Sequence, residues 1–137
     1  MAIKIRRVEY FYATVKDESG AAYELLSQLE RLGINLLAFT AIPMGPQRTQ
    51  LALFPEEPQH MESEAKKMGL ELDGPHPALL VQGDDELGVL ARIHENLSAA
   101  SVNVSASSGV ADGLGRFGYV IYVGPEDYER AAAALEV

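Results

Sequence analysis

The chain has 137 residues, a length that suits one domain or two small domains of about 70 residues each. It carries 11 Lys and Arg against 20 Asp and Glu, and the resulting net charge of −9 repels nucleic-acid backbones and anionic membrane surfaces. There is no cysteine, which excludes disulfides, thiolate metal sites and a cysteine nucleophile.

The N-terminal segment gives no sign of export. MAIKIRRVEYF lacks an apolar signal core and a small-residue cleavage site. No apolar run approaches the roughly 20 residues that are needed to span a bilayer. We therefore expect a cytoplasmic protein without a membrane partner.

The first half of the chain alternates strand patterns with helix patterns. β-branched and aromatic residues are frequent near the start, and apolar residues at helical spacing follow a turn that ends in Gly20. The expected elements are a strand at 5–15, a helix at 22–32, strands at 34–42 and 48–54, a helix at 58–68 and a short strand at 70–73. Gly74-Pro75-His76-Pro77 is expected to be a stiff break.

The same order restarts after this break. The expected elements are a strand at 78–82, a helix at 90–97, strands at 102–110 and 116–123, and a helix that begins at Pro125. Identical residues recur at an offset of 68: Asp17, Glu18, Gly20, Leu29, Asn35, Gly45 and Arg48 recur as Asp85, Glu86, Gly88, Leu97, Asn103, Gly113 and Arg116. After one deletion, Pro58, Glu62 and Ala65 recur as Pro125, Glu129 and Ala132. The identities coincide with matching elements, which indicates an internal repeat.

Each half has the order βαββα, and only the first half has a final β. This order predicts an α+β fold of two ferredoxin-like βαββαβ repeats, with antiparallel sheets and the helices on one face. We expect repeat 1 at residues 1–74 and repeat 2 at residues 75–137. Because repeat 2 lacks its last strand, one sheet edge is left open, and either the other repeat or another chain should cover it.

The strand at 116–123 is apolar on both faces. Phe117, Tyr119 and Ile121 alternate with Val120 and Tyr122. One face can pack on helices, and the other needs a cover from the second repeat or from a second subunit. We therefore expect association into a homo-oligomer, specifically a dimer.

Gly113-Leu114-Gly115-Arg116-Phe117-Gly118 spells GxGxxG, the fingerprint of dinucleotide sites. Such a site needs a helix after the motif, whereas a strand pattern follows here. We expect a hairpin loop around Asp112-Gly113 instead.

Residues 115–122, GRFGYVIY, approach an RNA-recognition signature, which leaves an RNA-recognition-like sheet as a further alternative. The Arg and Gly of the signature are transposed, the strand at 78–82 has no stacking aromatic, and the charge is −9. We expect no nucleic-acid partner.

No group suggests catalysis or a metal. His60, His76 and His94 lie in different elements without ligand-like spacing, and His94 is expected to be a packed or hydrogen-bonded residue of its helix. There is no Gly-x-Ser-x-Gly elbow, and Asp84-Asp85-Glu86 suits the positive end of a helix dipole. A small ferredoxin-like enzyme would need a catalytic cluster that is not found, so we expect neither an enzyme nor a cofactor.

The two Asp-x-x-Gly turns have the chemistry of an anion site. Gly88 lets other groups approach the backbone, and the first turn of a helix leaves N–H donors free for a carboxylate. Asp85 could cap the helix or meet an ammonium group, and Asn103 offers a donor and an acceptor. A capped helix start without a ligand is the alternative interpretation.

DELGVLARIHENLSAASVNV (residues 85–104) resembles the ACT-domain signature, in which Asp-x-Pro-Gly-x-Leu leads into a helix and then a Gly-Ile-Asn-Ile strand. ESGAAYELLSQLERLGINLLAF (residues 18–39) resembles a second copy of it. The resemblance covers essentially the whole chain as tandem domains. Leu87 and Ser19 stand where the family has proline, and Ser101 stands where it has glycine before the strand.

The resemblance implies a ferredoxin-like fold and a regulatory role, usually through amino acids that bind between paired domains. It implies that the ligand lies against the loop before the first helix and the start of the second strand. The implied ligand-binding residues are Asp85, Glu86, Leu87, Gly88, Val89 and Asn103, and in the weaker copy Asp17, Ser19, Gly20, Ala21 and Asn35.

The resulting hypothesis is a small tandem ACT protein that binds an amino acid or related metabolite at a repeat or subunit interface and regulates an enzyme partner. The alternative is a pure protein-association module without a ligand.

Overall fold

The computed structural model describes residues 2–137. Its elements are β1 (Ile3–Lys16), α1 (Ala21–Arg31), β2 (Leu36–Pro43), β3 (Arg48–Pro55), α2 (Pro58–Met68), β4 (Asp73–Asp84), α3 (Val89–Ala99), β5 (Val104–Ala111), β6 (Arg116–Val123), the 3₁₀ turn η1 (Pro125–Asp127) and α4 (Tyr128–Ala134). The expected helices and hairpins are confirmed. The expected strand at 70–73 and the break at 74–77 are wrong, because 73–84 is one strand.

The chain divides into two compact units. The N-unit comprises residues 9–76, and its strands have the order β2-β3-β1-β4. The C-unit comprises residues 77–137 together with residues 2–8, and its strands have the order β1-β4-β6-β5. Both orders belong to an antiparallel ferredoxin-like α+β unit with two helices, as expected from the sequence. The boundaries expected for the repeats, 1–74 and 75–137, stay a prediction.

The missing last strand of repeat 2 is supplied by the start of the chain. The Asp84 amide donates to the Ala2 carbonyl oxygen at 3.0 Å, and the Arg6 guanidinium donates to the Gln82 side-chain oxygen at 2.9 Å. The first part of β1 therefore pairs with β4 in the C-unit, in the place that a strand after α4 would take. The sequence left two possibilities for the strand that covers this edge, the other repeat or another chain, and in the structure the strand comes from the other repeat.

The internal repeat is visible in the backbone hydrogen bonds. The Asp17 amide donates to Gln47 O at 2.8 Å, and 68 positions later the Asp85 amide donates to Gly115 O at 2.9 Å. β2 and β5 also share a bulge at matching positions, after Leu36 and after Val104 respectively. The offset of 68 therefore superposes three-dimensional structure as well as sequence.

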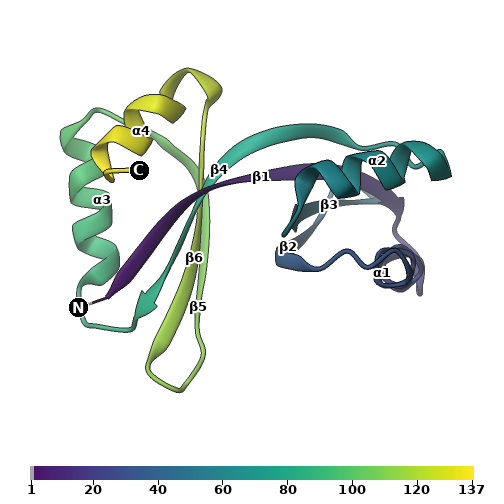
Figure 1. Cartoon of the computed structure of the whole chain (residues 1–137), viewed down its shortest axis with the longest axis horizontal. Helices are drawn as coiled ribbons and strands as arrows, with labels where there is room; N and C mark the ends of the chain where they lie inside the picture. Colours follow the sequence, from purple (N-terminus) through teal and green to yellow (C-terminus); the bar gives the residue numbers. More distant parts are fainter. Residues whose placement is uncertain (1) are drawn as a thin grey trace. The chain divides into compact units, whose positions relative to one another are not determined.

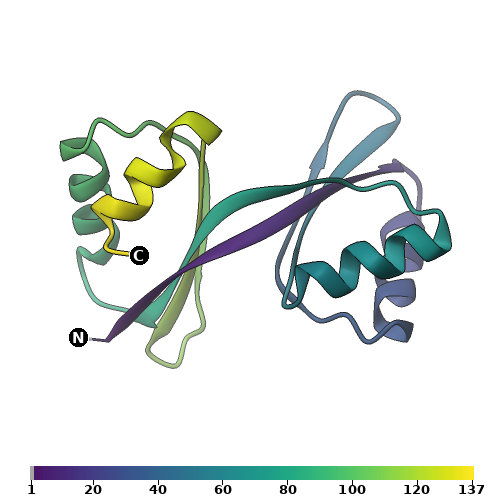
Figure 2. The same ribbon diagram turned by 45° about the horizontal axis from the view of Figure 1, so that its top comes forward.

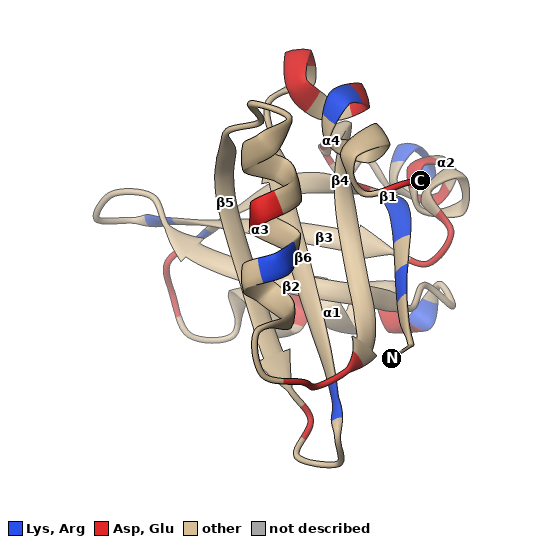
Figure 3. Cartoon of the chain, turned by 90° about the vertical axis from the view of Figure 1, so that its left-hand side faces the viewer, with Lys and Arg blue, Asp and Glu red and all other residues tan. Residues whose placement is uncertain are grey.

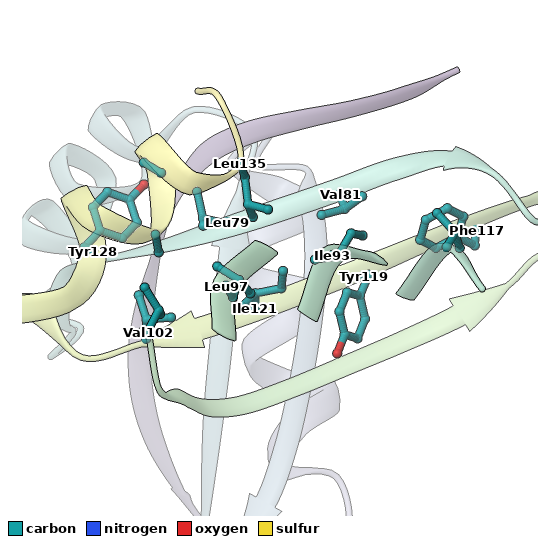
Figure 4. Close-up of a cluster of buried hydrophobic side chains, with 14 residues drawn as sticks. Leu79, Val81, Ile93, Leu97, Val102, Phe117, Tyr119, Ile121, Tyr128 and Leu135 are labelled. Carbon is teal, nitrogen blue, oxygen red and sulfur yellow. The ribbon is translucent and has the colours of Figure 1, made fainter. Parts of the chain in front are cut away.

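The core of the C-unit lies between its sheet and its two helices. Figure 1 shows α3 and α4 on the same face of β4, β6 and β5. The buried cluster, shown in Figure 4, consists of Leu79, Val81, Val89, Ile93, Leu97, Val102, Phe117, Tyr119, Ile121, Val123, Tyr128, Ala131, Ala132 and Leu135. Residues 117, 119, 121 and 123 alternate along β6, so one face of this strand packs on the helices.

The core of the N-unit likewise lies between its sheet and its two helices. In Figure 2 both helices of this unit are visible, with α2 crossing in front of α1. Leu25 and Leu29 of α1 and Met61 of α2 pack with residues of β1 and β3, among them Phe11 and Leu53. All five are buried. Leu25 and Leu29 are four positions apart, so they fall on the same face of α1.

Candidate functional site

The first part of the candidate site is the turn that joins β4 to α3. Gly88 has φ 84°, a left-handed conformation that favours glycine, and directly precedes α3. The Val89 amide donates to Glu86 O at 3.2 Å, and the Arg92 amide donates to Gly88 O at 3.1 Å. Figure 3 shows this turn in red, because Asp84, Asp85 and Glu86 follow one another. The turn is thus acidic and tightly folded.

The turn before α1 has the same geometry. Gly20 has φ 89°, the Ala21 amide donates to Glu18 O at 3.3 Å, and the Glu24 amide donates to Gly20 O at 2.9 Å. Asp17 and Ser19 are exposed here. The resemblance between the two turns therefore extends to the backbone, and what differs is the side chains.

Neither helix has a side-chain cap at its first residue. Of the two roles that the sequence left open for Asp85, the structure does not show the cap of α3: within residues 2–137 the Asp85 side chain forms no hydrogen bond, and the Asp85 backbone amide donates to Gly115 O of the β5–β6 hairpin. Glu86 lies 3.8 Å from the Arg92 guanidinium. The amides of the first turn of α3 therefore lack the carboxylate partner expected from the sequence, although an acidic side chain is close by.

Asn103 lies at the far end of α3 from Gly88. The helix has 11 residues, which at 1.5 Å per residue is roughly 16 Å. One copy of the repeat therefore brings Asp85, Glu86, Leu87, Gly88 and Val89 together and holds Asn103 apart from them. The same separation holds in the N-unit, where Asn35 lies beyond the end of α1.

The two asparagines have different surroundings. The Asn35 amide nitrogen donates to Glu56 Oε2 at 2.7 Å, so this side chain already has a carboxylate partner. Asn103 is exposed, and across residues 2–137 only its backbone amide has a hydrogen bond, to Asp127 Oδ2 at 3.5 Å. The Asn103 side chain is therefore available to a ligand, whereas that of Asn35 is engaged.

A cleft lies beside each of the two asparagines. In the N-unit a cleft of about 350 Å³ runs between α1 and the start of β2. In the C-unit a cleft of about 610 Å³ lies between α3 and β5. Each of the seven residues that line the smaller cleft has its counterpart, 68 positions later, in the lining of the larger one. The clefts are therefore equivalent features of the two repeats.

The glycine-rich motif forms a hairpin, as expected. The Asp112 amide donates to Arg116 O at 2.9 Å, and Asp112 Oδ1 accepts from the Leu114 and Arg116 amides at 2.7 and 3.1 Å. These two amides hold the pKa of the Asp112 carboxyl below its ordinary value. The motif thus closes β5–β6 and supports the Asp85 turn through Gly115 O.

Two of the three aromatics of the RNA-like signature, Phe117 and Tyr119, face the wrong way for stacking. Phe117 and Tyr119 are buried in the cluster under α3 and α4. A stacking platform needs aromatic rings on an open sheet face. The RNA-recognition-like interpretation therefore loses two of its contact residues.

Two other features bear on the class of site. Within residues 2–137, no group of three His, Asp or Glu side chains is arranged to hold a metal ion. No helix in the same range is long and apolar enough to cross a membrane.

No protein-family model and no curated protein matches the chain. Solved structures do match. Protein BT0572 from Bacteroides thetaiotaomicron is similar with a TM-score of 0.80 and 17% sequence identity, over 96% of this chain and 88% of that one. The ligand-free regulatory subunit of aspartate kinase from Thermus thermophilus is similar with a TM-score of 0.64 and 17% identity, over 99% of this chain and 95% of that one. The same subunit from Thermus flavus gives a TM-score of 0.60 and 17% identity, over 98% and 94%.

The chain has a tandem ACT-like fold. Its first ACT-like repeat contributes the Gly20 turn and the Leu26 cleft, and its second contributes the Gly88 turn and the His94 cleft. Sequence reasoning found both turns and both asparagines. It noted Ser101 only as a departure from the family glycine and did not single out Ser98 or Ser107; all three line the larger cleft. The signal that could have found the first two is the change of residue type between equivalent positions of the ACT-like repeats.

Proposed function

We propose that this chain is a regulatory protein that binds an amino acid or a related metabolite and passes the binding event to an enzyme partner. The ligand-binding residues are Asp85, Glu86, Leu87, Gly88, Val89 and Asn103, with Asp17, Ser19, Gly20, Ala21 and Asn35 as the weaker set. The support from fold is that two similar structures are regulatory subunits of a kinase that acts on aspartate.

The observation that carries the proposal is the helix start at Gly88. The Val89 amide donates to Glu86 O, but Gly88 has no side chain that could satisfy the next two amides, those of Leu90 and Ala91, which have no partner within residues 2–137. Free amides at a helix N-terminus attract a carboxylate, since both the hydrogen bonds and the helix dipole favour an anion. Asp85 is exposed beside them and can meet the ammonium group of the same ligand.

The separation of Gly88 from Asn103 indicates how a ligand would be enclosed. If both contact one amino acid, a second copy of the chain must bring its Asn103 to the Gly88 turn, because the two lie at opposite ends of α3. Binding would then favour the dimer over the monomer by the difference in ligand affinity between them. Regulation would follow from this change in association.

A thermal-shift panel of the twenty amino acids tests the proposal. A ligand at 100 times its Kd stabilises the folded state by about 2.7 kcal/mol. Gly88→Asp and Gly20→Asp form a matched pair, because both glycines have nearly the same φ, 84° and 89°, and an added Cβ has space at both. Gly88→Asp should abolish the shift, since its carboxylate repels that of the ligand, and Gly20→Asp should retain it.

The alternative, an association module without a ligand, is favoured by exposed apolar side chains near the hairpin. Leu87 is fully exposed, Leu114 is 88% exposed and Val110 is 74% exposed. The hydrogen bond from the Asp85 amide to Gly115 O joins the turn that carries Leu87 to the hairpin loop that carries Leu114. Under this alternative, Leu87→Ser with Leu114→Ser would dissociate the oligomer in size-exclusion chromatography, and no amino acid would shift unfolding.

A further inference from the structure

The two equivalent clefts differ in chemistry at three positions. Leu26, Glu30 and Gly33 of the N-unit cleft are replaced by His94, Ser98 and Ser101 in the C-unit cleft. A hydrocarbon becomes an imidazole, a carboxylate becomes a hydroxyl, and a glycine gains a hydroxyl. The repeat therefore serves as an internal control, because the backbone frame is shared and only the lining has changed.

A fourth difference between the two units lies beneath the cleft, where Tyr119 of the C-unit contacts His94. His94 Nε2 lies 2.6 Å from the Tyr119 hydroxyl, and Tyr119 stands where the N-unit has the fully buried Leu51. Figure 4 shows the Tyr119 ring among the buried side chains, with its hydroxyl at the edge of the cluster. A buried tyrosine hydroxyl needs a hydrogen-bond partner, so the pair fixes the orientation of the imidazole.

This pair has a proton to donate in either tautomer. If the Tyr119 hydroxyl donates to Nε2, the imidazole proton is on Nδ1. If Nε2–H donates to the hydroxyl oxygen, the hydroxyl proton remains for another acceptor. Leu26 and Leu51 offer neither, so the N-unit cleft lacks this function.

Ser101 keeps a hydroxyl at a position where glycine would be easier to accommodate. Its φ is 59°, in the left-handed region, and the equivalent Gly33 has φ 72°. A non-glycine residue in this region costs about 1–2 kcal/mol of backbone strain. Its side chain lines the cleft together with that of Asn103, which lacks the carboxylate partner that Asn35 has in Glu56.

The absence of charged side chains from the described lining of the cleft restricts the class of ligand that the cleft can bind. Among the described residues that line the C-unit cleft there is no Asp, Glu, Lys or Arg, and Figure 3 shows β5 without any of them. A cationic side chain would find no free counter-charge, because the Asp127 carboxylate, which accepts from the Asn103 amide at 3.5 Å, is already paired with Arg130. A purely hydrocarbon side chain would leave the hydroxyls of the lining without a partner. A hydroxyl or carboxamide would satisfy them, and a carboxylate would do so by accepting hydrogen bonds from the serine hydroxyls, the Asn103 amide and the imidazole, although Lys and Arg are absent from the described lining as well.

We propose that His94, oriented by Tyr119, determines the specificity of the α3–β5 cleft for amino acids whose side chain carries a hydroxyl, carboxamide or carboxylate group. This inference rests on the proposed amino-acid binding and adds to it the ligand class and the contact residue. His94 touches the ligand, and Tyr119 is a positioning residue. The N-unit cleft, with leucine at both positions, does not share this selectivity.

Calorimetric titration of the full chain with serine, threonine, asparagine, glutamine, aspartate, glutamate, lysine, leucine and valine tests the inference. The wild type should prefer one of the first six over lysine, leucine and valine. His94→Leu should reduce that preference about ten-fold, equivalent to ~1.4 kcal/mol. His94→Gln, which keeps a donor and an acceptor, should restore part of it, and Tyr119→Phe, which removes only the hydroxyl, should weaken it. His60→Leu is the matched control, since His60 also bonds a neighbour, Leu32 O at 3.1 Å, but in the N-unit.

Nitrogen NMR of the histidine rings gives a second readout that is independent of folding. The bound ligand should shift the ring signals of His94 and leave those of His60 and His76 unchanged. Tight binding with His94→Leu selectivity equal to wild type, or with an unchanged His94 signal, would overturn this inference and leave amino-acid binding standing. If none of the nine probes binds the wild type, this inference falls, and the thermal-shift panel of all twenty amino acids decides whether the proposed function falls with it.

Discussion

The Arg7 guanidinium donates two hydrogen bonds to the Glu129 carboxylate, at 2.8 and 3.0 Å. The same guanidinium donates to the Val137 carbonyl oxygen at 3.2 Å and lies 5.6 Å from the centre of the Tyr128 ring. Within the C-unit, these contacts join the strand that closes the sheet to the last helix of the chain. The start and the end of the sequence are therefore both needed to complete the second repeat.

This ion pair makes stability depend on pH. Its hydrogen bonds lower the pKa of Glu129 below the ordinary value of 4.5 and raise that of Arg7. A lowered carboxyl pKa stabilises the folded state above pH 4.5, and the contribution is lost as the pH falls through the lowered pKa. Glu129→Gln should therefore lower the unfolding temperature at neutral pH and cease to matter in strong acid. Glu95→Gln, on the exposed side of α3, is the control; equal effects of the two changes would contradict the prediction.

A methyl group at Gly83 should disrupt the closing strand. An added Cβ would lie 2.5 Å from the Ala2 carbonyl oxygen and 2.6 Å from Ile3 Cγ2, closer than packed atoms allow. We expect Gly83→Ala to cost about 1–3 kcal/mol in urea unfolding, as overpacking does. Gly118→Ala is matched, because Gly118 lies opposite Gln82 in the same sheet with open space around its Cβ position. If both substitutions cost the same, residues 2–8 do not lie against Gly83.

Replacing Ser101 by glycine and replacing Gly33 by serine should change the stability of the chain in opposite directions. Ser101→Gly should stabilise the chain by about 1 kcal/mol, because glycine accepts the left-handed backbone that serine resists. Gly33→Ser should destabilise it by a similar amount, since an added Cβ meets no atom and only backbone strain changes. Thermal unfolding of both variants checks the signs. A neutral or destabilising Ser101→Gly would show that the serine hydroxyl contributes to folding.

Leu97 and Leu87 contrast a buried with an exposed leucine at the two ends of one segment. Leu97 is 1% exposed within the C-unit cluster, whereas Leu87 is fully exposed. Leu97→Ala should cost about 2–5 kcal/mol through the cavity it leaves. Leu87→Ala should change stability by less than about 0.5 kcal/mol. A large loss at Leu87 in urea unfolding would mean that its side chain is covered in solution by a second copy.

Local sequence patterns were enough to predict the helices and the fold class of the two repeats. Apolar spacing placed α1 and α3. Gly33 and Gly69, which follow α1 and α2 in the sequence, have the left-handed φ values of 72° and 71° that are typical of a helix end. The offset of 68 carried the fold class, because matching residues fell in matching elements. The resemblance to ACT domains then rested on the turns at Gly20 and Gly88.

Contacts between segments that are far apart in the sequence could not be predicted from local patterns. Pro75 suggested a break, yet in the N-unit β4 is an edge strand, where a residue without an N–H costs no ladder bond. The sequence predicted an open sheet edge in repeat 2 but left its cover undecided, since nothing in the strand expected at 5–15 indicated a second pairing partner. The His94–Tyr119 contact joins residues 25 positions apart and depends on how α3 lies over β6.

The central claim is that the helix start at Gly88 binds an amino acid. Amide NMR spectra of the isotopically labelled chain, titrated with each of the twenty amino acids, test it most directly because they detect even millimolar binding. At least one amino acid should shift the signals of Gly88, Val89 and Asn103 in a saturable way, and Gly88→Asp should abolish the shifts while Gly20→Asp keeps them. Spectra unchanged by all twenty would contradict the claim.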